Sequence, residues 1–123
     1  MIETIDHAEL MHKIADDQDF ILINVLPEDY FKMSHIPGSF NAPAEAPSFV
    51  NTVQSFVKNT NKNIIVYCTN ESCTASEIAA KKLIDAGYQN VSDFSGGMQE
   101  WHEAGGRLVS SMDKDGCGSS CGC

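Results

Sequence analysis

The sequence predicts a three-layer α/β domain, in which a central, mainly parallel sheet of about five strands has helices on both faces. Short β-rich apolar runs alternate along the chain with segments whose apolar residues recur at helical spacing. Two of the runs, residues 20–25 and 64–67, are apolar almost throughout, which is typical of parallel strands buried on both faces. Residues that start and stop helices stand between the runs, where an alternating pattern requires them.

The first helix and the first strand follow from residues near the start of the chain. Residues 6–9, Asp-His-Ala-Glu, have the form of a capping box and begin a helix. Leu10 and Ile14 continue this helix at helical spacing. The run at residues 20–25 is the first predicted strand, and residues 27–31 predict a short helix that begins at its proline.

The middle of the chain combines a turn with a longer amphipathic helix. Residues 35–38, His-Ile-Pro-Gly, predict a turn, and a brief strand is expected at residues 39–41. Pro47 is expected to begin a helix whose apolar residues lie on one face. After a polar break, residues 64–67 form the second predicted buried strand, which leads directly into Cys68.

The last third of the domain repeats the alternation of helix and strand. Residues 74–77, Thr-Ala-Ser-Glu, have the form of a second capping box, and they begin a helix that Gly87 ends. Residues 91–94 predict a short strand, and the glycine pair at residues 96–97 predicts a turn. A final helix is expected at residues 98–104, where two further glycines follow it.

Length and composition predict one domain at residues 1–109 and a flexible tail rich in Cys, Gly and Ser at residues 110–123. A chain of 123 residues and 13.4 kDa is long enough to bury one hydrophobic core. The tail consists mainly of small, polar and charged residues, and a segment of that composition cannot bury a core of its own.

The charge of the chain narrows the classes of partner. Its net charge of −9 argues against binding to nucleic acid or to an anionic membrane, because Lys and Arg supply most of that affinity. No apolar run approaches the roughly 20 residues of a membrane span. The first residues lack the basic and apolar regions of a secretory signal, so we expect a cytoplasmic protein. Arg107, the single arginine, is distant in sequence from the candidate catalytic cysteine.

Cys68 is that candidate catalytic residue. Ligands of open α/β sheets bind beyond the carboxyl ends of the strands, and Cys68 follows such an end. The backbone N–H groups of residues Thr69, Asn70, Glu71, Ser72, Cys73 and Thr74 are expected to form an anion-binding loop before the next helix. These donors and the helix N-terminus would lower the pKa of the Cys68 thiol and favour its thiolate.

Several motifs in this order resemble those of the rhodanese-like sulfurtransferases. The residues concerned are the strand and cysteine at 64–68, the His-Ile-Pro-Gly turn at 35–38, and the Gly-Gly-x-x-x-Trp segment at 96–101. The resemblance covers most of residues 1–109. It implies the rhodanese-like fold, and it implies a cysteine that accepts sulfane sulfur as a persulfide and passes it to a thiol or another nucleophile.

The sequence departs from the pattern of that family at its loop and at one strand end. The family's common loop is C-x4-R, but the corresponding position here is Cys73, so the loop is similar to a C-x4-C variant. The loop is about two residues longer than the common form, and Glu71 within it would oppose a dianion. Residues 24–26 read Asn-Val-Leu where Asp-Val-Arg is common. Polysulfide or a persulfide therefore fits the loop better than thiosulfate does.

The resemblance implies a sulfurtransferase that needs no cofactor. Its implied partners are a small sulfur donor and a thiol acceptor, either a small molecule or a protein. A thiol redox switch or a soft-metal-binding module on the same scaffold is the alternative, since the loop holds two cysteines. A phosphatase or arsenate reductase is disfavoured. Those relatives resemble C-x5-R in the loop, and the sixth position after Cys68 here is Thr74.

The remaining cysteines leave alternatives open. Cys73 could resolve a persulfide on Cys68, could accept its sulfur, or could pack under the loop as a small apolar residue. Cys117, Cys121 and Cys123 offer three soft ligands for Zn²⁺ or Cu(I), one fewer than a closed tetrahedral zinc site requires. The tail could instead collect sulfur from Cys68, or it could have no specific task.

Overall fold

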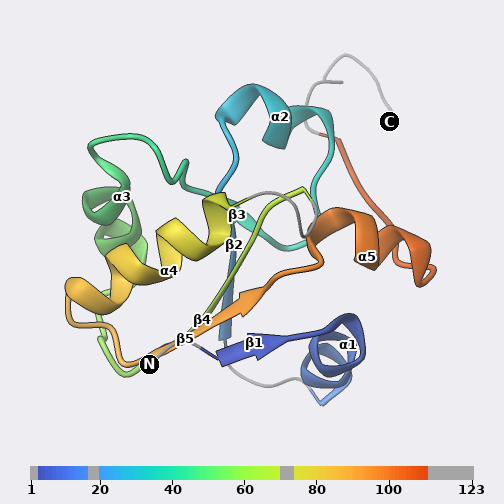
Figure 1. The fold of residues 1–123 in the computed structure, drawn as a ribbon, viewed down its shortest axis with the longest axis horizontal. Coiled ribbons are helices and arrows are strands. Elements are labelled where there is room, and N and C mark those ends of the chain that lie inside the picture. The colour runs from blue at the N-terminus through green and yellow to red at the C-terminus, as the bar shows by residue number, and fades with distance from the viewer. Residues whose placement is uncertain (1–2, 17–19, 70–73, 111–123) are drawn as a thin grey trace.

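A computed structural model describes residues 3–16, 20–69 and 74–110 of the chain. Within these residues a five-stranded parallel sheet is covered by helices on both faces, as Figure 1 shows. The three-layer α/β architecture predicted from the alternation of strands and helices is therefore confirmed. Parallel strands require crossover connections, and the helices between the strands provide them.

The sheet has the strand order β1-β5-β4-β2-β3, and every neighbouring pair is parallel. The strands are β1 (Glu3–Ile5), β2 (Phe20–Asn24), β3 (Phe40–Asn41), β4 (Asn63–Tyr67) and β5 (Asn90–Phe94). The central strand β4 pairs with β2 on one side and β5 on the other, which explains why it is the most continuously buried strand.

The helices divide between the two faces of the sheet. They are α1 (His7–Ala15), α2 (Glu28–Met33), α3 (Phe49–Phe56), α4 (Ala75–Asp85) and α5 (Gly97–Glu103). Helices α3 and α4 cover one face, and α1 and α5 cover the other (Figure 1). Helix α2 buries none of its residues and lies near the carboxyl ends of the strands (Figure 1).

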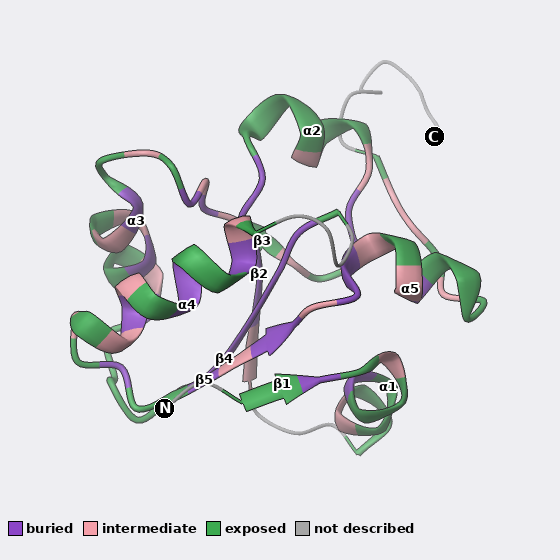
Figure 2. Cartoon of the chain, in the orientation of Figure 1, coloured by how far each residue is buried: buried purple, intermediate pink, exposed green. Residues whose placement is uncertain are grey.

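Two hydrophobic clusters fill the space between the layers, and the alternation along β4 decides which residue joins which cluster. Ile64, Val66 and Cys68 face α3 and α4, whereas Ile65 and Tyr67 face α1 and α5. Figure 2 shows the resulting burial, with purple along the central strands, green on the edge strand β1 and green on the outer helix faces. Cys68 therefore stands at the end of the strand that both clusters share.

Most predicted elements are confirmed, with boundaries that differ by one or two residues. One strand was not predicted. Residues Glu3–Ile5 form the edge strand β1, which pairs with β5 and ends shortly before α1. The capping box at Asp6 is confirmed, because its side chain accepts from the backbone N–H of Glu9 at 2.9 Å.

The second predicted capping box, at Thr74, is wrong. Thr74 precedes α4 with φ −95° and ψ 2°, and its side chain makes no capping hydrogen bond. An N-cap side chain reaches the following N–H groups from an extended backbone, which Asp6 has at φ −107° and ψ −179°. The other end of α4 follows the prediction, because Gly87 has a φ of 105° immediately after the last turn.

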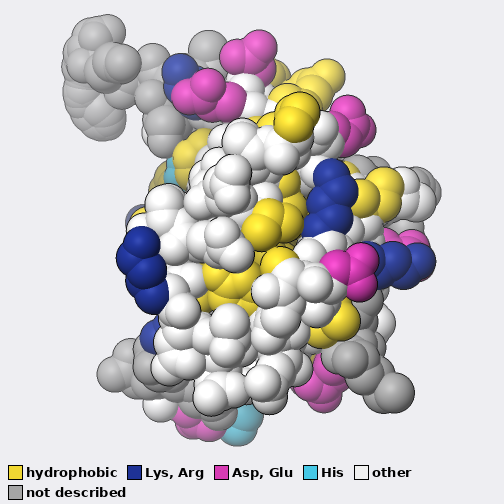
Figure 3. Space-filling view, turned by 90° about the vertical axis from the view of Figure 1, so that its left-hand side faces the viewer, with side chains coloured by type: hydrophobic (Ala, Val, Ile, Leu, Met, Phe, Trp, Pro, Cys, Tyr) yellow, Lys and Arg dark blue, Asp and Glu magenta, His cyan; other side chains and the backbone are white. Residues whose placement is uncertain are grey.

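The surface over α3 and α4 mixes hydrophobic, basic and acidic side chains without a large patch of one charge, as Figure 3 shows. Ion pairs between neighbouring helical turns contribute to this mixture. On this surface Lys81 pairs with Glu77 of α4 at 3.5 Å. A separate pair on α2 joins Lys32 and Glu28 at 3.6 Å. Among the described residues, no helix is long and apolar enough to cross a membrane.

Candidate active site

Cys68 immediately follows β4 and is fully buried in the cluster between the sheet and helices α3 and α4. Its thiol donates a hydrogen bond to the hydroxyl of Ser76, with 3.7 Å between the sulfur and the oxygen. Ser76 is the second residue of α4, so the thiol lies against the first turn of a helix of 11 residues. A thiolate at this position would be stabilised by the positive end of the helix dipole.

Asp93 is the second ionisable group of this region. It lies on β5 and is only 8% exposed, and its neighbours across the sheet are Val66 and Thr4. Desolvation raises the pKa of the Asp93 carboxyl, a hydrogen bond with the Ser76 side chain lowers it, and the nearby charge of Glu77 raises it again. Oδ1 of Asp93 is buried and has no hydrogen-bond partner among the described residues.

The first turn of α5 holds the backbone that carries the thiol. The N–H of Met98 donates to the carbonyl of Cys68 at 3.0 Å, and the N–H of Gln99 donates to the carbonyl of Thr69 at 2.9 Å. Gly97 has a φ of 61° and approaches Cys68 so closely that a Cβ atom would lie 2.4 Å from its carbonyl oxygen. The second glycine of the Gly-Gly-x-x-x-Trp segment is therefore required by packing against the backbone at the end of β4.

Tyr67 fixes the opposite side of the same strand end. Its hydroxyl accepts from the side-chain amide of Asn24 at 3.1 Å and from the N–H of Ile36 at 3.0 Å. The hydroxyl of Ser39 donates to the carbonyl of Ile36, so Tyr67 donates its own proton to the oxygen of Ser39 at 2.8 Å. Burial raises the pKa of Tyr67, and the neutral phenol with all its hydrogen bonds made is the stable form.

The side chain of Asn24 organises the end of β2, where residues 24–26 are Asn-Val-Leu instead of the common Asp-Val-Arg. Its side-chain oxygen accepts from the N–H of Leu26 at 2.9 Å, while its amide donates to Tyr67. The carbonyls of both Asn24 and Leu26 accept from the side chain of Asn41. This network is buried at Asn24 and satisfies the polar groups of the strand end without a charged residue.

The predicted turn at His35 contacts both helix α2 and the last described residues of the chain. The ring of His35 stacks on Phe31 at 3.9 Å, and its Nδ1 lies 2.8 Å from the carbonyl of Phe31 and therefore carries the proton. His35 and Val109 exchange two backbone hydrogen bonds of 2.9 Å. The hydroxyl of Ser110 donates to the carbonyl of Lys32, so the chain reaches residue 110 against α2.

The residues predicted for the site divide into a described and an undescribed group. Thr69 and Thr74 are exposed on either side of the loop, and the carbonyl of Thr74 accepts the first backbone hydrogen bond of α4. Asn70, Glu71, Ser72 and Cys73 lie outside the described residues, as do Cys117, Cys121 and Cys123 of the tail. Within the described ranges, no three His, Cys, Asp or Glu side chains are grouped to hold a metal ion.

Ser76 and Asp93 were not predicted as site residues. The signal for Asp93 was present in the sequence, because a carboxylate occupies an inward-facing position of a strand, two residues after the buried Val91. The sequence indicates Ser76 only as part of a capping box. Its meeting with Cys68 depends on how the first turn of α4 packs against β4, which a local motif does not describe.

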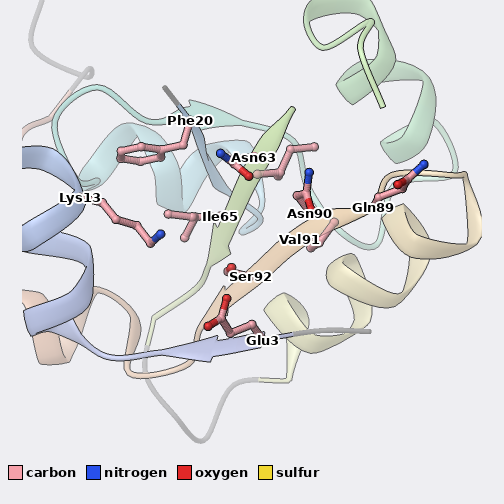
Figure 4. Close-up of a pocket in the computed structure, with 10 residues that line it drawn as sticks. Glu3, Lys13, Phe20, Asn63, Ile65, Gln89, Asn90, Val91 and Ser92 are labelled. Atoms are coloured by element: carbon pink, nitrogen blue, oxygen red, sulfur yellow. The ribbon is translucent and has the colours of Figure 1, made fainter. Parts of the chain in front are cut away.

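A separate pocket of about 460 Å³ opens at the amino ends of the strands, shown in Figure 4. Phe20, Asn63 and Asn90, the first residues of β2, β4 and β5, line it together with Glu3 and Lys13. Cys68 follows the other end of β4 and does not line it. The pocket therefore lies at the opposite end of the sheet from the Cys68 thiol.

The chain is similar to known proteins over most of its length. A family model described as the rhodanese-like domain matches residues 6–104. The Adenylyltransferase and sulfurtransferase UBA4 of Candida albicans is 30% identical over 73% of this chain, which spans only 21% of that relative. A protein of Schizosaccharomyces pombe, provisionally named thiosulfate sulfurtransferase, mitochondrial, is 32% identical and is matched over 76% of this chain and 71% of its own length.

Solved structures match the fold as well. The BH2092 protein of Bacillus halodurans superposes with a TM-score of 0.77 and 25% identity, over 89% of this chain and 78% of that one. The thiosulfate sulfurtransferase of Pseudomonas aeruginosa superposes with a TM-score of 0.78 at 24% identity, over 88% of this chain and 20% of that one. At 24% identity, the similarity to the Pseudomonas aeruginosa structure is evidence for the fold alone.

Proposed function

This chain belongs to the rhodanese-like domain family, and we propose that it is a sulfur carrier whose Cys68 accepts sulfane sulfur as a persulfide and passes it to a thiol. Sulfur transfer in general is supported by relatives that are named sulfurtransferases. The observation that carries the proposal is the position of Cys68 beyond the carboxyl end of the central strand, against the first turn of α4.

The environment of Cys68 suits a thiolate nucleophile. A helix N-terminus favours the charged form of the thiol, and the Ser76 hydroxyl can donate to a thiolate as readily as it accepts from a thiol. Attack on the outer sulfur of a polysulfide or persulfide forms the Cys68 persulfide and releases the remainder of the donor. The reaction requires no group beyond the thiol and its hydrogen-bond partners.

We assign polysulfide and persulfides, rather than thiosulfate, as the preferred donors. Thiosulfate is a dianion that is best held by a bidentate guanidinium, and the chain has a single arginine, Arg107. The carbonyl of Arg107 accepts from the indole N–H of Trp101 at 2.8 Å, which ties this residue to the end of α5. Glu71 in the loop adds a negative charge that opposes a dianion further.

Cys73 and the tail cysteines are proposed as the routes by which sulfur leaves Cys68. Cys73 is five positions beyond Cys68 in the same loop, so it is the nearest thiol along the sequence. Its attack on the persulfide would release reduced sulfur and leave a disulfide, or it would take the sulfur itself. The tail begins after Ser110, which contacts α2, and it offers three further thiols.

Transfer of sulfur to cyanide under turnover conditions tests the proposal. The reduced protein is supplied with polysulfide or thiosulfate, and thiocyanate is measured against time. After the spontaneous reaction of polysulfide with cyanide in protein-free buffer is subtracted, we expect turnover with polysulfide at a kcat/KM at least tenfold above that with thiosulfate. A Cys68→Ser variant should give no rate above the protein-free reaction. Thiocyanate formation that is equal for the two donors would contradict the donor assignment. A bare Cys68–Cys73 disulfide with no transfer would favour a redox switch.

A further inference from the structure

The register of the sheet builds the pocket at the amino ends of the strands. One row of side chains comes from the residues that begin three neighbouring strands: Phe20, Asn63 and Asn90. A second row lies two residues further along β4 and β5 and consists of Ile65, Ser92 and, across from Ser92 on β1, Glu3. Side chains two residues apart on a strand share a face, and Ile65 packs in the cluster under α1 and α5. Both rows therefore face the layer of α1 and α5.

Helix α1 leaves the amino-terminal part of this face open. Among the described residues, Lys13 is the single helical residue that lines the pocket, and it lies in the last turn of α1. Ile65 and the partly buried Phe20 provide apolar surface, while most of the other lining side chains are polar. The volume of about 460 Å³ is in the range of pockets that bind small organic molecules.

Two opposite charges enter the pocket from different elements. Lys13 and Glu3 both line it, and Figure 4 shows their charged ends directed toward the same space beside Ser92. The two side chains do not form an ion pair with each other, and neither has a side-chain hydrogen bond or ion pair to another described residue. Lys81 and Lys32, in contrast, each pair with a carboxylate of their own helix. The ammonium and the carboxylate in the pocket are therefore available to a ligand.

Neutral polar groups complete the lining. The side-chain amide of Asn90 donates to the carbonyl of Asn61 at 2.7 Å, which anchors this side chain and leaves its oxygen as an acceptor. The hydroxyl of Ser92 can donate or accept a hydrogen bond, and Gln89 and Asn63 each contribute a further amide to the lining. Groups of this kind match the N–H and C=O groups of a peptide or a carboxamide.

We propose that this pocket binds a small zwitterion of the amino acid type, either a free amino acid or a dipeptide. Its carboxylate would pair with Lys13 and its ammonium with Glu3, while the neutral side chains would bind its amide groups. Phe20 and Ile65 would contact its apolar part. The pocket lies at the opposite end of β4 from Cys68, so its occupation does not depend on sulfur chemistry.

The pair of opposite charges disfavours simpler ligands. An inorganic anion would be attracted by Lys13 but repelled by Glu3, and the net charge of −9 on the chain would oppose it further. A simple cation would be attracted by Glu3 but repelled by Lys13. A zwitterion satisfies both groups, and it brings no net charge to an acidic protein.

The experiment is a titration of the isotope-labelled, reduced protein with the dipeptide L-alanyl-L-glutamine, followed by the amide NMR signals of the backbone. We expect saturable shifts that are largest at Lys13, Asn90 and Ser92. The Kd should be about 0.1–1 mM, which is typical of the binding energy per atom for a ligand of this size. Measurement at about 0.15 M salt screens the distant charges of the protein.

Two capped forms of the dipeptide separate the two charge contacts. The N-acetylated form lacks the ammonium, and the form with a C-terminal amide lacks the carboxylate. The wild type should bind each capped form about fivefold more weakly than the free dipeptide, as expected for the loss of one exposed ion pair. Lys13→Gln should lose the preference for the free carboxylate, and Glu3→Gln should lose the preference for the free ammonium, because the partner of that charge is missing.

Lys81→Gln and Glu28→Gln are the matched control variants. Each removes a charge of the same sign from an ion pair that does not line the pocket. Both should bind the dipeptide within twofold of the wild type. Lys13→Gln and Glu3→Gln should keep the melting temperature of the wild type, because neither side chain has a partner to lose among the described residues.

Three results would overturn the zwitterion site. The first is the absence of saturable shifts up to about 10 mM dipeptide. The second is a set of shifts that is largest around Cys68, since the dipeptide would then bind at the other end of the sheet. The third is an affinity for the three probes that is the same in the wild type, Lys13→Gln and Glu3→Gln, because neither charge would then contact the ligand.

Discussion

The α-carbon of Gly97 lies against the carbonyl of Cys68, at a separation that leaves no room for a side chain. A Cβ atom on residue 97 would come within 2.4 Å of the Cys68 oxygen and 2.9 Å of its carbonyl carbon. The neighbouring N–H of Met98 donates to the same oxygen. The first turn of α5 therefore supports the backbone that carries the Cys68 thiol.

Replacement of Gly97 by alanine should destabilise the protein strongly. The added methyl group clashes with backbone atoms, which cannot move aside without shifting Cys68, and the φ of 61° is strained for alanine. We expect a loss of more than about 3 kcal/mol in the free energy of unfolding, measured with urea. The rate of sulfur loading per folded molecule should also fall, because the strand end moves.

Gly105→Ala is the matched control at the other end of α5. Gly105 also has a positive φ, of 94°, but a Cβ atom there would meet nothing within 4 Å. This variant should lose only the cost of the backbone conformation, about 1 kcal/mol. Equal losses in the two variants would mean that the contact between Gly97 and Cys68 does not govern the stability of this region.

Tyr67→Phe should cost more than the removal of another buried tyrosine hydroxyl. The N–H of Ile36 and the amide of Asn24 would both lose their acceptor, and each unsatisfied buried donor costs about 1–3 kcal/mol. Tyr88→Phe leaves only the carbonyl of Val57 without its partner and should cost about 1 kcal/mol. Urea unfolding of both variants measures the difference.

The catalytic consequence of Tyr67→Phe should be small. The side chain of Tyr67 packs with the α1 and α5 cluster, whereas Cys68 packs with the α3 and α4 cluster. Sulfur loading per folded molecule should therefore stay within about twofold of the wild type. A large loss of loading at full folding would show that the Tyr67 network positions the thiol across the sheet.

Asp93→Asn should stabilise the protein at neutral pH and less so in acid. The folded-state pKa of Asp93 is raised, so the native protein holds this proton above the pH at which the unfolded chain releases it. The wild type therefore loses stability as the pH rises from about 4 through the folded pKa, and the loss stays complete above it. Asparagine does not titrate and avoids this loss.

The measurement is the free energy of unfolding of both proteins at several pH values between 4 and 8. The advantage of Asp93→Asn should grow with pH over this range. A constant difference, or a wild type that gains on the variant as the pH rises, would contradict the raised pKa.

Cys73→Ser should leave sulfur loading of Cys68 intact and change the later release of that sulfur. If Cys73 resolves the persulfide, the variant should accumulate more persulfide and form no disulfide between residues 68 and 73. Peptide mass after timed exposure to polysulfide measures both species. Release that is unchanged in this variant would assign the next step to an external thiol or to the tail.

The tail makes a separate prediction. Replacement of Cys117, Cys121 and Cys123 by serine should leave the melting temperature of the domain unchanged, because residues of this composition bury no core. If the tail receives sulfur, mass added to the tail peptide of the wild type should disappear in a Cys68→Ser variant. Tail sulfur that persists without Cys68 would show direct reaction with the donor.

The layers of the fold were predictable because hydrophobic pattern alone determines them. The runs at β2 and β4 are apolar on both faces, which a parallel sheet between two helix layers requires. The edge strand β1 was not predicted, because three residues with one buried side chain carry no periodic signal. Its place is set by pairing with β5, which is a contact between distant parts of the chain.

The candidate site was predictable only in part, for a similar reason. Cys68 could be placed because it follows a clear strand and precedes a helix, and both features are local. Ser76 comes from another element and meets the thiol through packing, so no spacing in the sequence indicates it. At Thr74 the local sequence misled the prediction. The motif predicted a capping hydrogen bond, which the backbone conformation of Thr74 prevents.

Mass analysis of the reduced protein after brief exposure to polysulfide tests the central claim most directly. One added sulfur on the peptide that contains Cys68, removable by cyanide and missing from the same peptide of a Cys68→Ser variant, is the predicted result. Sulfur loading that survives in Cys68→Ser, or that occurs only on the tail, would contradict the assignment of Cys68 as the residue that accepts sulfur.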